Sequence, residues 1–265
     1  MAAEGRPVPL AKLCRWLGVP RRSVYYQPKR RSRPLNELLV ARIKAKLEQF
    51  PTYGYRRLAA ILGENRKPVQ RVLQRKGWQV RKRPQGHRPR ARSLPSVASQ
   101  PDERWATDLT QIWCGKDRRA ALAVVIDCCT REVLGWRLSS RGNSPTAEAA
   151  LEEALIERHG VLQRVGRPLA LRSDNGLVFS SRQYTATVRA YGLTQEFTTP
   201  YTPEQNGLME RFFRSLKEEC IWQHRFESLG QARTVIGQWM KYYNEQRPHQ
   251  ALGYAAPRAH PALSA

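Results

Sequence analysis

The pattern of hydrophobic and polar positions divides the chain into a helical first part and a second part that alternates strands and helices. Residues 8–27 carry an apolar stripe at helical spacing, then a turn at Gly18–Pro20, then a second short helix that begins with Arg21 and Arg22. The stripe consists of Leu10, Leu13, Cys14 and Leu17. This pattern predicts a helix-turn-helix whose arginines meet phosphates or base edges, although an ordinary helical hairpin has the same pattern.

Residues 35–83 predict a second helical module. One helix runs from Leu35 to Phe50, a break follows at Pro51–Tyr55, and a second helix begins at Arg56. A third helix covers residues 68–75 and stops at Gly77. Residues 84–101 are rich in Pro, Arg and Ser without periodicity, which predicts a linker.

From about residue 102 the pattern changes to short apolar runs separated by amphipathic stretches. The predicted strands are 104–112, 120–127, 132–139, 168–172 and 193–197, and the predicted helices are 143–159, 182–191, one from Pro203 and one over 228–244. The helix at Pro203 is predicted from the capping box Thr202–Gln205. This order predicts an α/β layer on a mixed five-stranded sheet, preceded by all-α modules.

Five segments follow from these boundaries. They are a helix-turn-helix segment at 1–34, a second helical module at 35–83, a basic linker at 84–101, an α/β core at 102–222 and a C-terminal helical tail at 223–265.

The positive charge of the chain is concentrated at its beginning. The net charge is +24, and residues 1–100 hold 25 Lys/Arg against 4 Asp/Glu. Such asymmetry is typical of a region that binds a polyanion, and a solubilising basic tail is the alternative. Because basic residues lie on predicted helices, we expect a phosphate-contacting face. The expected DNA contacts in these helices are Arg21, Arg22, Arg56, Arg57, Arg66, Lys67, Arg71 and Arg75.

Three carboxylates stand out in the second part. Asp108 lies within the first predicted strand, Asp174 directly follows the fourth, and Glu210 lies on the helix after the fifth, with 35 residues between the last two acids. Hard divalent cations prefer carboxylate oxygens, and phosphoryl-transfer enzymes hold such ions with few protein ligands. The alternative for Glu210 is an exposed helix acid paired with Arg214.

Other residues have simpler interpretations. Asp127 ends the second strand, and we expect it to stabilise a turn. Trp105 and Trp113 are expected to pack in the interior rather than stack on bases. The five cysteines form no zinc-like cluster, which favours reduced thiols. No segment has the length of a membrane span and no signal peptide is apparent, so we expect a cytosolic protein.

These motifs together resemble a known family. Residues 101–254 resemble the RNase H-like catalytic core shared by retroviral integrases and bacterial insertion-sequence transposases, the DDE class. The resemblance rests on Trp105-Ala-Thr-Asp108, on Ser173-Asp174-Asn-Gly176, on Asn206-Gly207 followed by Glu210 and Lys217, and on the tail Tyr243–Tyr254. The N-terminal helices resemble those of insertion sequences that encode the transposase in two overlapping frames, and this chain resembles the second-frame product.

The resemblance implies a transposase that cleaves and joins DNA strands at the ends of an insertion sequence. Asp108, Asp174 and Glu210 would be catalytic and would hold two Mg²⁺ or Mn²⁺ ions, while Lys217 and Arg214 would hold phosphates. The implied partners are duplex DNA with terminal inverted repeats, target DNA, further copies of the chain and a first-frame protein. A joining step within one element would form a circular intermediate.

Two features depart from the family, and two other functions stay open. Arg172 stands where relatives often have His, which leaves no shuttle for protons there, and the zinc-binding module of retroviral integrases is absent. A regulatory DNA-binding protein without turnover would not need the three acids. A nuclease for RNA–DNA hybrids would not need the basic helical modules.

Overall fold

The fold is described from a computed structural model, which covers residues 8–27, 34–80, 98–198 and 206–263. The predicted linker therefore lies largely outside the described residues. The chain forms two compact units that divide between Leu39 and Val40. In the described residues, no helix is both long and apolar enough to cross a membrane. All five cysteines are free thiols, as predicted.

The first unit contains the two short helices that the sequence predicts. They are α1 (Leu10–Trp16) and the single-turn α2 (Arg21–Val24). Their apolar side chains are poorly covered, since Leu17 is 73% exposed and Cys14 is the one buried side chain within residues 8–27. Arg21 and Arg22 are exposed at the start of α2. The helix pair is confirmed, and its binding to DNA stays a prediction.

The second helical module consists of α3 (Glu37–Gln49), α4 (Tyr55–Leu62) and α5 (Arg66–Lys76). Helices α4 and α5 end at Gly63 and Gly77, both in the left-handed conformation that glycine adopts without strain. Helix α5 begins two residues earlier than predicted because the Asn65 side chain accepts a hydrogen bond from the Lys67 amide. Pro68 then falls in the first turn, where no backbone donor is needed.

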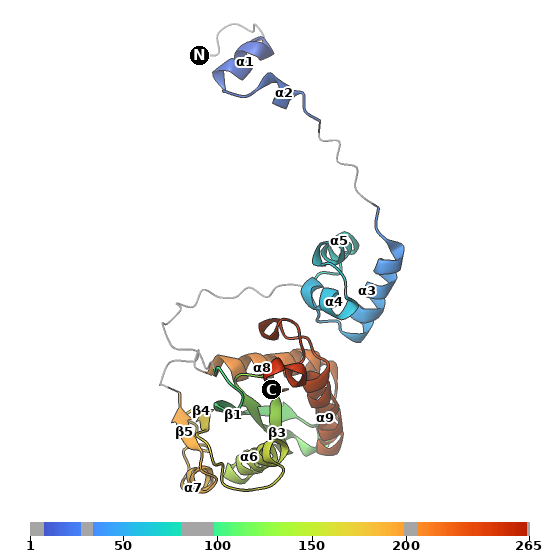
Figure 1. Ribbon diagram of the computed structural model, residues 1–265. Coiled ribbons are helices and arrows are strands. Elements are labelled where there is room, and N and C mark those ends of the chain that lie inside the picture. Colours follow the sequence, from blue (N-terminus) through green and yellow to red (C-terminus); the bar gives the residue numbers. More distant parts are fainter. Residues whose placement is uncertain (1–7, 28–33, 81–97, 199–205, 264–265) are drawn as a thin grey trace, which may run out of the picture. The chain divides into compact units, whose positions relative to one another are not determined.

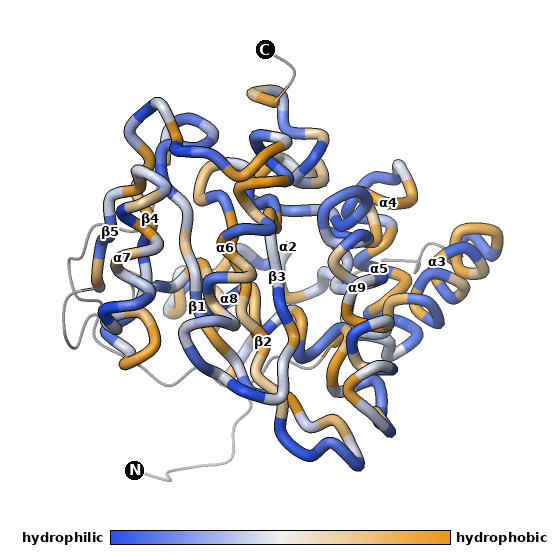
Figure 2. Tube along the Cα trace, turned by 90° about the horizontal axis from the view of Figure 1, so that it is seen from below, coloured by the Kyte–Doolittle hydropathy of each residue, from blue (hydrophilic) through white to orange (hydrophobic). Residues whose placement is uncertain are grey.

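The catalytic core contains the predicted mixed sheet of five strands in the order β3-β2-β1-β4-β5 (Figure 1). The strands are β1 (Arg104–Trp113), β2 (Arg119–Asp127), β3 (Val133–Ser139), β4 (Ala170–Ser173) and β5 (Thr194–Phe197). The first three are antiparallel neighbours, whereas β4 runs parallel to β1 and β5 parallel to β4. Strand β2 is buried on both faces and is apolar along most of its length (Figure 2).

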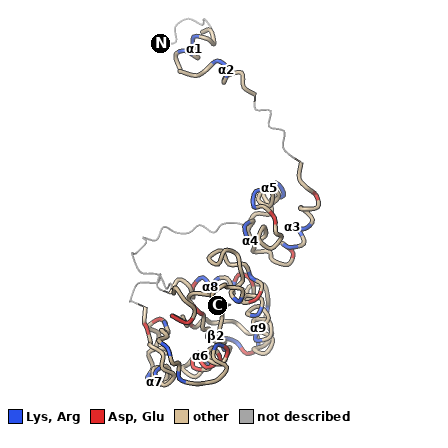
Figure 3. The backbone as a smooth tube through the Cα atoms, viewed as in Figure 1, with Lys and Arg blue, Asp and Glu red and all other residues tan. Residues whose placement is uncertain are grey.

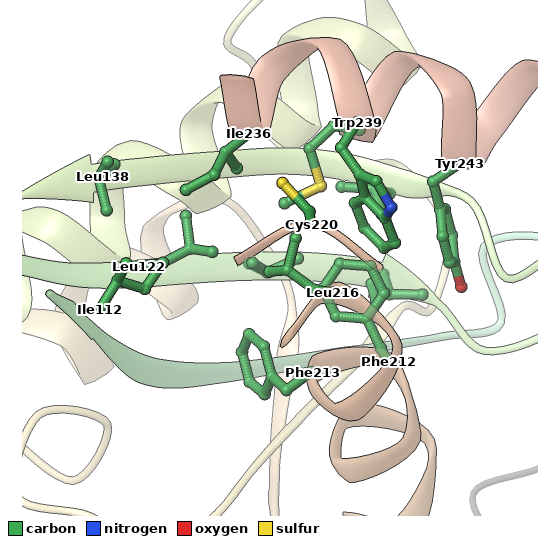
Figure 4. Close-up of a cluster of buried hydrophobic side chains, with 14 of the residues drawn as sticks. Ile112, Leu122, Leu138, Phe212, Phe213, Leu216, Cys220, Ile236, Trp239 and Tyr243 are labelled. Atoms are coloured by element: carbon green, nitrogen blue, oxygen red, sulfur yellow. The ribbon is translucent and has the colours of Figure 1, made fainter. Parts of the chain in front are cut away.

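Four long helices cover the two faces of this sheet. Helices α6 (Ser144–His159) and α7 (Arg182–Ala190) pack on one face, against Trp105 and Leu171. Helices α8 (Gly207–Glu219) and α9 (Leu229–Glu245) pack on the other, where Phe212, Leu216 and Trp239 fill the core (Figure 4). The helix predicted from Pro203 can be compared only in part, because residues 199–205 lie outside the described residues. Its described part is α8, with Asn206 at the N-cap.

Two expectations about single residues have opposite outcomes. Asp127 is a turn residue, as predicted, because its Oδ1 accepts hydrogen bonds from the Cys129 and Thr130 amides. Trp105 is fully buried, but Trp113 is 61% exposed, so the packing prediction for Trp113 is wrong. Trp113 is the last residue of β1, and because side chains alternate along a strand it points to the face opposite its buried neighbour Ile112.

The C-terminal segment is held to the outer edge of the sheet by a side chain. The Asn244 side chain accepts a hydrogen bond from the Val133 amide at 2.9 Å and donates one to the Val133 carbonyl at 2.8 Å. Asn244 thus replaces a neighbouring strand at the start of β3. Beyond α9 the chain forms short 3-10 turns at Gln250–Leu252, Pro257–Ala259 and Pro261–Leu263.

Candidate active site and nucleic-acid interface

Asp108 lies on β1, and Asp174 directly follows β4, the strand that runs parallel to β1. Arg104 pairs with Ala170 and Ala106 with Arg172, so the same register two residues further places Asp108 opposite Asp174. Neighbouring strands are about 4.8 Å apart. Because side chains alternate along a strand, both acids lie on the face of Ala106, which is the face that α8 covers.

Asp108 is half-buried and is oriented by two hydrogen bonds. Its Oδ1 accepts one from the Leu109 amide at 2.7 Å, and its Oδ2 accepts one from the Asn206 side chain at 3.1 Å. Asn206 is buried and is the N-cap of α8, but its side chain makes no capping bond. It therefore fastens the start of α8 to β1. Asn206 belongs to the Asn206-Gly207 motif of the sequence, but no sequence pattern indicated that its side chain contacts Asp108.

Asp174 is held by a tight turn directly after β4. Its Oδ1 accepts a hydrogen bond from the Gly176 amide at 2.9 Å, and the Asn175 side chain donates to the Thr198 carbonyl at 2.7 Å. A Cβ at position 176 would lie 2.9 Å from the same Asp174 oxygen. Glycine at this position therefore lets the backbone approach the carboxylate closely.

Glu210 lies in the first turn of α8 and is exposed. Its neighbours Met209, Phe212 and Phe213 face the core (Figure 4). The alternative pairing with Arg214 does not occur, because Arg214 pairs with Glu218 at 3.0 Å. Lys217 is half-buried on the same helix.

The three acids contrast with other acids of the core. Asp102, Glu132, Glu196 and Glu219 each contact two arginines or more. In the described residues, no salt bridge involves Asp108, Asp174 or Glu210. Burial raises the pKa of Asp108 to about 6 against the lowering effect of the Leu109 amide, and the charges of Asp174 and Glu210 add to the increase.

This donor set suits a hard divalent cation. Three uncompensated carboxylates repel one another, and a cation between them would remove that repulsion. However, within the described ranges no three His, Cys, Asp or Glu residues already lie close enough to hold one ion. The structure brings Asp108 and Asp174 together and sets Glu210 on the helix above them. A metal-bound arrangement stays a prediction.

Arg172, which the sequence marks as a departure from the family pattern, is held by an ion pair. It pairs with Glu196 at 3.0 Å, and Arg104 pairs with the same carboxylate at 3.0 Å. All three side chains lie on the sheet beside the acids. Arg172 is thus engaged in an ion-pair network that links β1, β4 and β5.

The predicted DNA-contacting residues of the second helical module separate into two groups. Exposed basic residues concentrate on α5 and at the start of α4 (Figure 3). They are Arg56, Arg66, Lys67, Arg71 and Arg75. Arg57 differs, because its guanidinium contacts Glu219 of α8 at 2.9 Å. Its sequence neighbourhood does not distinguish it from Arg56.

Comparisons with known proteins agree with this fold. Two models described as integrase core domain match residues 98–203 and 191–257. A protein of insertion element IS407 from Burkholderia multivorans is 32% identical over 93% of this chain and 88% of its own length. The transposase InsD of IS2 from Escherichia coli is 29% identical over 90% of this chain and 83% of its own length. The chain belongs to the DDE transposases of insertion sequences.

The family assignment sets the class of reaction. This transposase is a polynucleotidyl transferase of DNA recombination, and enzymes with an integrase core are metal-dependent. A chain of the simian T-cell lymphotropic virus intasome, solved in complex with a PP2A regulatory subunit, superposes with a TM-score of 0.50 at 19% identity. That match covers 82% of this chain and 73% of the viral one and concerns the fold alone.

Proposed function

We propose that this transposase cleaves and joins DNA strands at the ends of its insertion sequence with Asp108, Asp174 and Glu210 as catalytic residues. The observation that carries the proposal is the convergence of Asp108 on β1, Asp174 directly after β4, and the start of α8, which Asn206 fastens to Asp108. In a chain with 46 Lys/Arg and 22 Asp/Glu, acids that form no salt bridge within the described residues, beside ion-paired neighbours, favour a bound cation.

In this proposal, Asp108 and Asp174 hold the metal from the sheet and Glu210 from the helix. Two Mg²⁺ or Mn²⁺ ions, when bound there, would supply Lewis acidity to the attacking oxygen of the nucleophile and to the leaving oxygen of the phosphodiester. Asn206 orients Asp108 through its side-chain amide, and Gly176 keeps the turn at Asp174 tight. Lys217 and Arg214 hold phosphates of the element end along α8.

The reaction has two displacements at phosphorus. Water first attacks the phosphodiester at the element end, and the 3′-oxygen leaves as a hydroxyl. That 3′-hydroxyl then attacks a second phosphodiester, forming a new P–O bond while another 3′-oxygen leaves. Joining the two ends of one element in this way gives a circular intermediate. No covalent bond between protein and DNA is required.

The DNA partners follow from the charge of the helical modules. We propose that the exposed basic residues of α4 and α5 bind duplex phosphates, and that Arg21 and Arg22 of the first unit add contacts. The substrates are the terminal inverted repeats and the target duplex. We further propose action as a multimer on nucleoid DNA, with a first-frame protein that contributes binding to the element ends.

The test is a cleavage and joining assay on a labelled duplex that carries the DNA flanking this gene, with Mg²⁺ or Mn²⁺. Wild type is compared with Asp174→Asn and Glu210→Gln, and with Glu227→Gln, an exposed glutamate just before α9, as a matched control. We expect joined products from wild type and Glu227→Gln, and none from the other two variants. Joining by Asp174→Asn would contradict the assignment.

Metal binding is measured independently of turnover. Mg²⁺ should raise the melting temperature of wild type and of Glu227→Gln, and should do so less for Glu210→Gln. DNA binding with no cleavage, even after addition of the first-frame protein, would favour a regulatory protein. Cleavage of RNA–DNA hybrids without joining of DNA would favour a nuclease.

A further inference from the structure

Glu219, the last residue of α8, holds arginines from two distant parts of the chain. Arg57 of α4 approaches its carboxylate at 2.9 Å, and Arg247, which follows α9, approaches it at 2.7 and 2.8 Å through two nitrogens. The side chains of Glu219 and Arg247 are only 9% and 3% exposed. A buried carboxylate with two guanidinium partners is costly to disturb, because removing one partner leaves charge without compensation.

Aromatic side chains surround this ion pair network. The Tyr53 hydroxyl hydrogen-bonds to the Tyr242 hydroxyl of α9, and the ring of Phe50 stacks on both, with centroid distances of 4.9 and 5.3 Å. The guanidinium of Arg57 lies 4.9 Å from the centre of the Tyr53 ring. Tyr53 is 1% exposed. The turn between α3 and α4 is therefore packed against α8 and α9 rather than loosely tethered to them.

The C-terminal motif that begins at Tyr243 completes the network. Arg247 also donates a hydrogen bond to the Ser215 hydroxyl at 3.0 Å, one turn before Glu219 on α8. The Tyr243 ring contacts Phe212 of α8 at 5.0 Å and His249 at 4.7 Å between centroids. The C-terminal motif Tyr243–Tyr254 thus contacts α8, the helix that carries Glu210.

We propose that Arg57, Glu219 and Arg247 are positioning residues that couple the second helical module to the catalytic helix. The proposal rests on the proposed function of Glu210. Glu219 follows Glu210 by nine residues within one helix, so about 13 Å of continuous helix joins them. When the exposed basic residues of α4 and α5 bind a duplex, α4 and its residue Arg57 are displaced. The ion pair between Arg57 and Glu219 then displaces α8 as well. Arg57 acts on the reaction through Glu219 and not through phosphate.

The adjacent arginines permit a matched comparison in the full chain. Arg57→Met and Arg56→Met are each measured for binding of a 20-base-pair duplex, for the kinetics of strand cleavage and for hydrogen exchange of residues 207–219 with and without that duplex. In wild type, the duplex should slow exchange in α8. Arg57→Met should abolish this protection and lower kcat about tenfold, with KM changed less than about twofold.

Arg56→Met should have the opposite effect. It should weaken duplex binding and raise KM, while the duplex, once bound at saturation, still protects α8. Arg57→Lys should restore at least part of the protection and of kcat, since lysine keeps one charged contact with Glu219.

Two results would overturn the proposal. One is an Arg57→Met protein with normal kcat and normal protection of α8. The other is an Arg57→Met protein whose duplex affinity falls and whose KM rises as in Arg56→Met. That result would make Arg57 an ordinary phosphate contact. Because hydrogen exchange needs no turnover, it decides the coupling even if the catalytic assignment of Glu210 fails.

Discussion

Asp174 directly follows β4 and lies close enough to Asp108 of the adjacent parallel strand β1 for its charge to act on that carboxylate, and no salt bridge in the described residues involves either acid. Their proximity explains why the charge of Asp174 contributes to the raised pKa of Asp108. A site of this kind is poorly stable until a cation binds. Function and stability are therefore opposed at this position of the fold.

The first prediction is that Asp108→Asn stabilises the metal-free protein at neutral pH. The pKa of Asp108 in the folded chain, about 6, lies above its ordinary value. A raised carboxylate pKa adds stability that is fully present below about pH 4 and is lost as the pH rises through 6. At pH 8 in EDTA, we expect the variant to be more stable by about 1–3 kcal/mol. Urea unfolding at pH 8 and pH 4 measures this, and an equal difference at both values would contradict it.

The second prediction concerns Asn206, whose side chain donates a hydrogen bond to Asp108 and does not cap the start of α8. Asn206→Ser keeps a good capping residue but cannot reach Asp108. We expect it to retain stability within about 1 kcal/mol while strand cleavage falls about tenfold. Asn206→Asp should be worse, because it adds a carboxylate beside Asp108. Thermal unfolding and cleavage rates separate the two effects, and full activity of the serine variant would remove Asn206 from the site.

The third prediction concerns the edge of the sheet. Asn244→Leu leaves the Val133 amide and carbonyl without their partners in a buried place. We expect a loss of about 2–4 kcal/mol in the free energy of unfolding. Asn244→Asp, which keeps an acceptor for the amide but no donor for the carbonyl, should not restore stability. Denaturant unfolding checks this, and a loss below about 0.5 kcal/mol would show that water replaces the side chain.

The fourth prediction tests the basic face of α5. Arg71→Ala should weaken binding to duplexes of any sequence and reduce the slope of log affinity against log salt by about 1, since one phosphate contact releases about 0.9 counterion. Arg189→Ala provides the control, because Arg189 is exposed on α7, on the face of the sheet opposite α8. Fluorescence anisotropy over a range of salt concentrations measures both. Equal slopes for Arg71→Ala and wild type would place the DNA elsewhere.

The fifth prediction uses His249, which is half-buried. Burial, together with the charges of Arg247 and Arg57, lowers the pKa of His249 to about 3. A histidine with a lowered pKa costs stability as the pH falls from its ordinary value of about 6.5, because the unfolded chain takes up the proton first. Replacing it in His249→Phe should make unfolding less sensitive to pH between 6.5 and 4. Parallel pH profiles for wild type and variant would show that the ring is accessible to protons in the folded state.

Much of the local structure could be predicted from the chain alone. Apolar periodicity predicted all five strands of the sheet to within two residues, and Asn143-Ser-Pro145 predicted the start of α6. The turn role of Asp127 also followed from its position at a strand end. These features depend on contacts between residues near in sequence, so the sequence determines them.

Contacts between distant segments could not be predicted in the same way. Arg56 and Arg57 are adjacent residues of the same type, and no sequence pattern separates them. Their side chains nevertheless point about 100° apart around α4, and only Arg57 contacts Glu219. Arg214 has an acid four residues away on either side and pairs with Glu218 rather than Glu210. Trp113 is exposed whereas Ile112, beside it on β1, is buried, a difference that apolar character alone does not predict.

The sequence by itself determined the elements, the charge asymmetry and the identity of the three acids, because these follow from local patterns and composition. Only the tertiary structure decided that Asp108 faces Asp174, that Asn206 joins α8 to β1 and that Glu219 gathers Arg57 and Arg247. The reason is physical. Strand register and helix docking minimise the free energy of the whole packed core, and no local stretch of sequence contains both partners of such a contact.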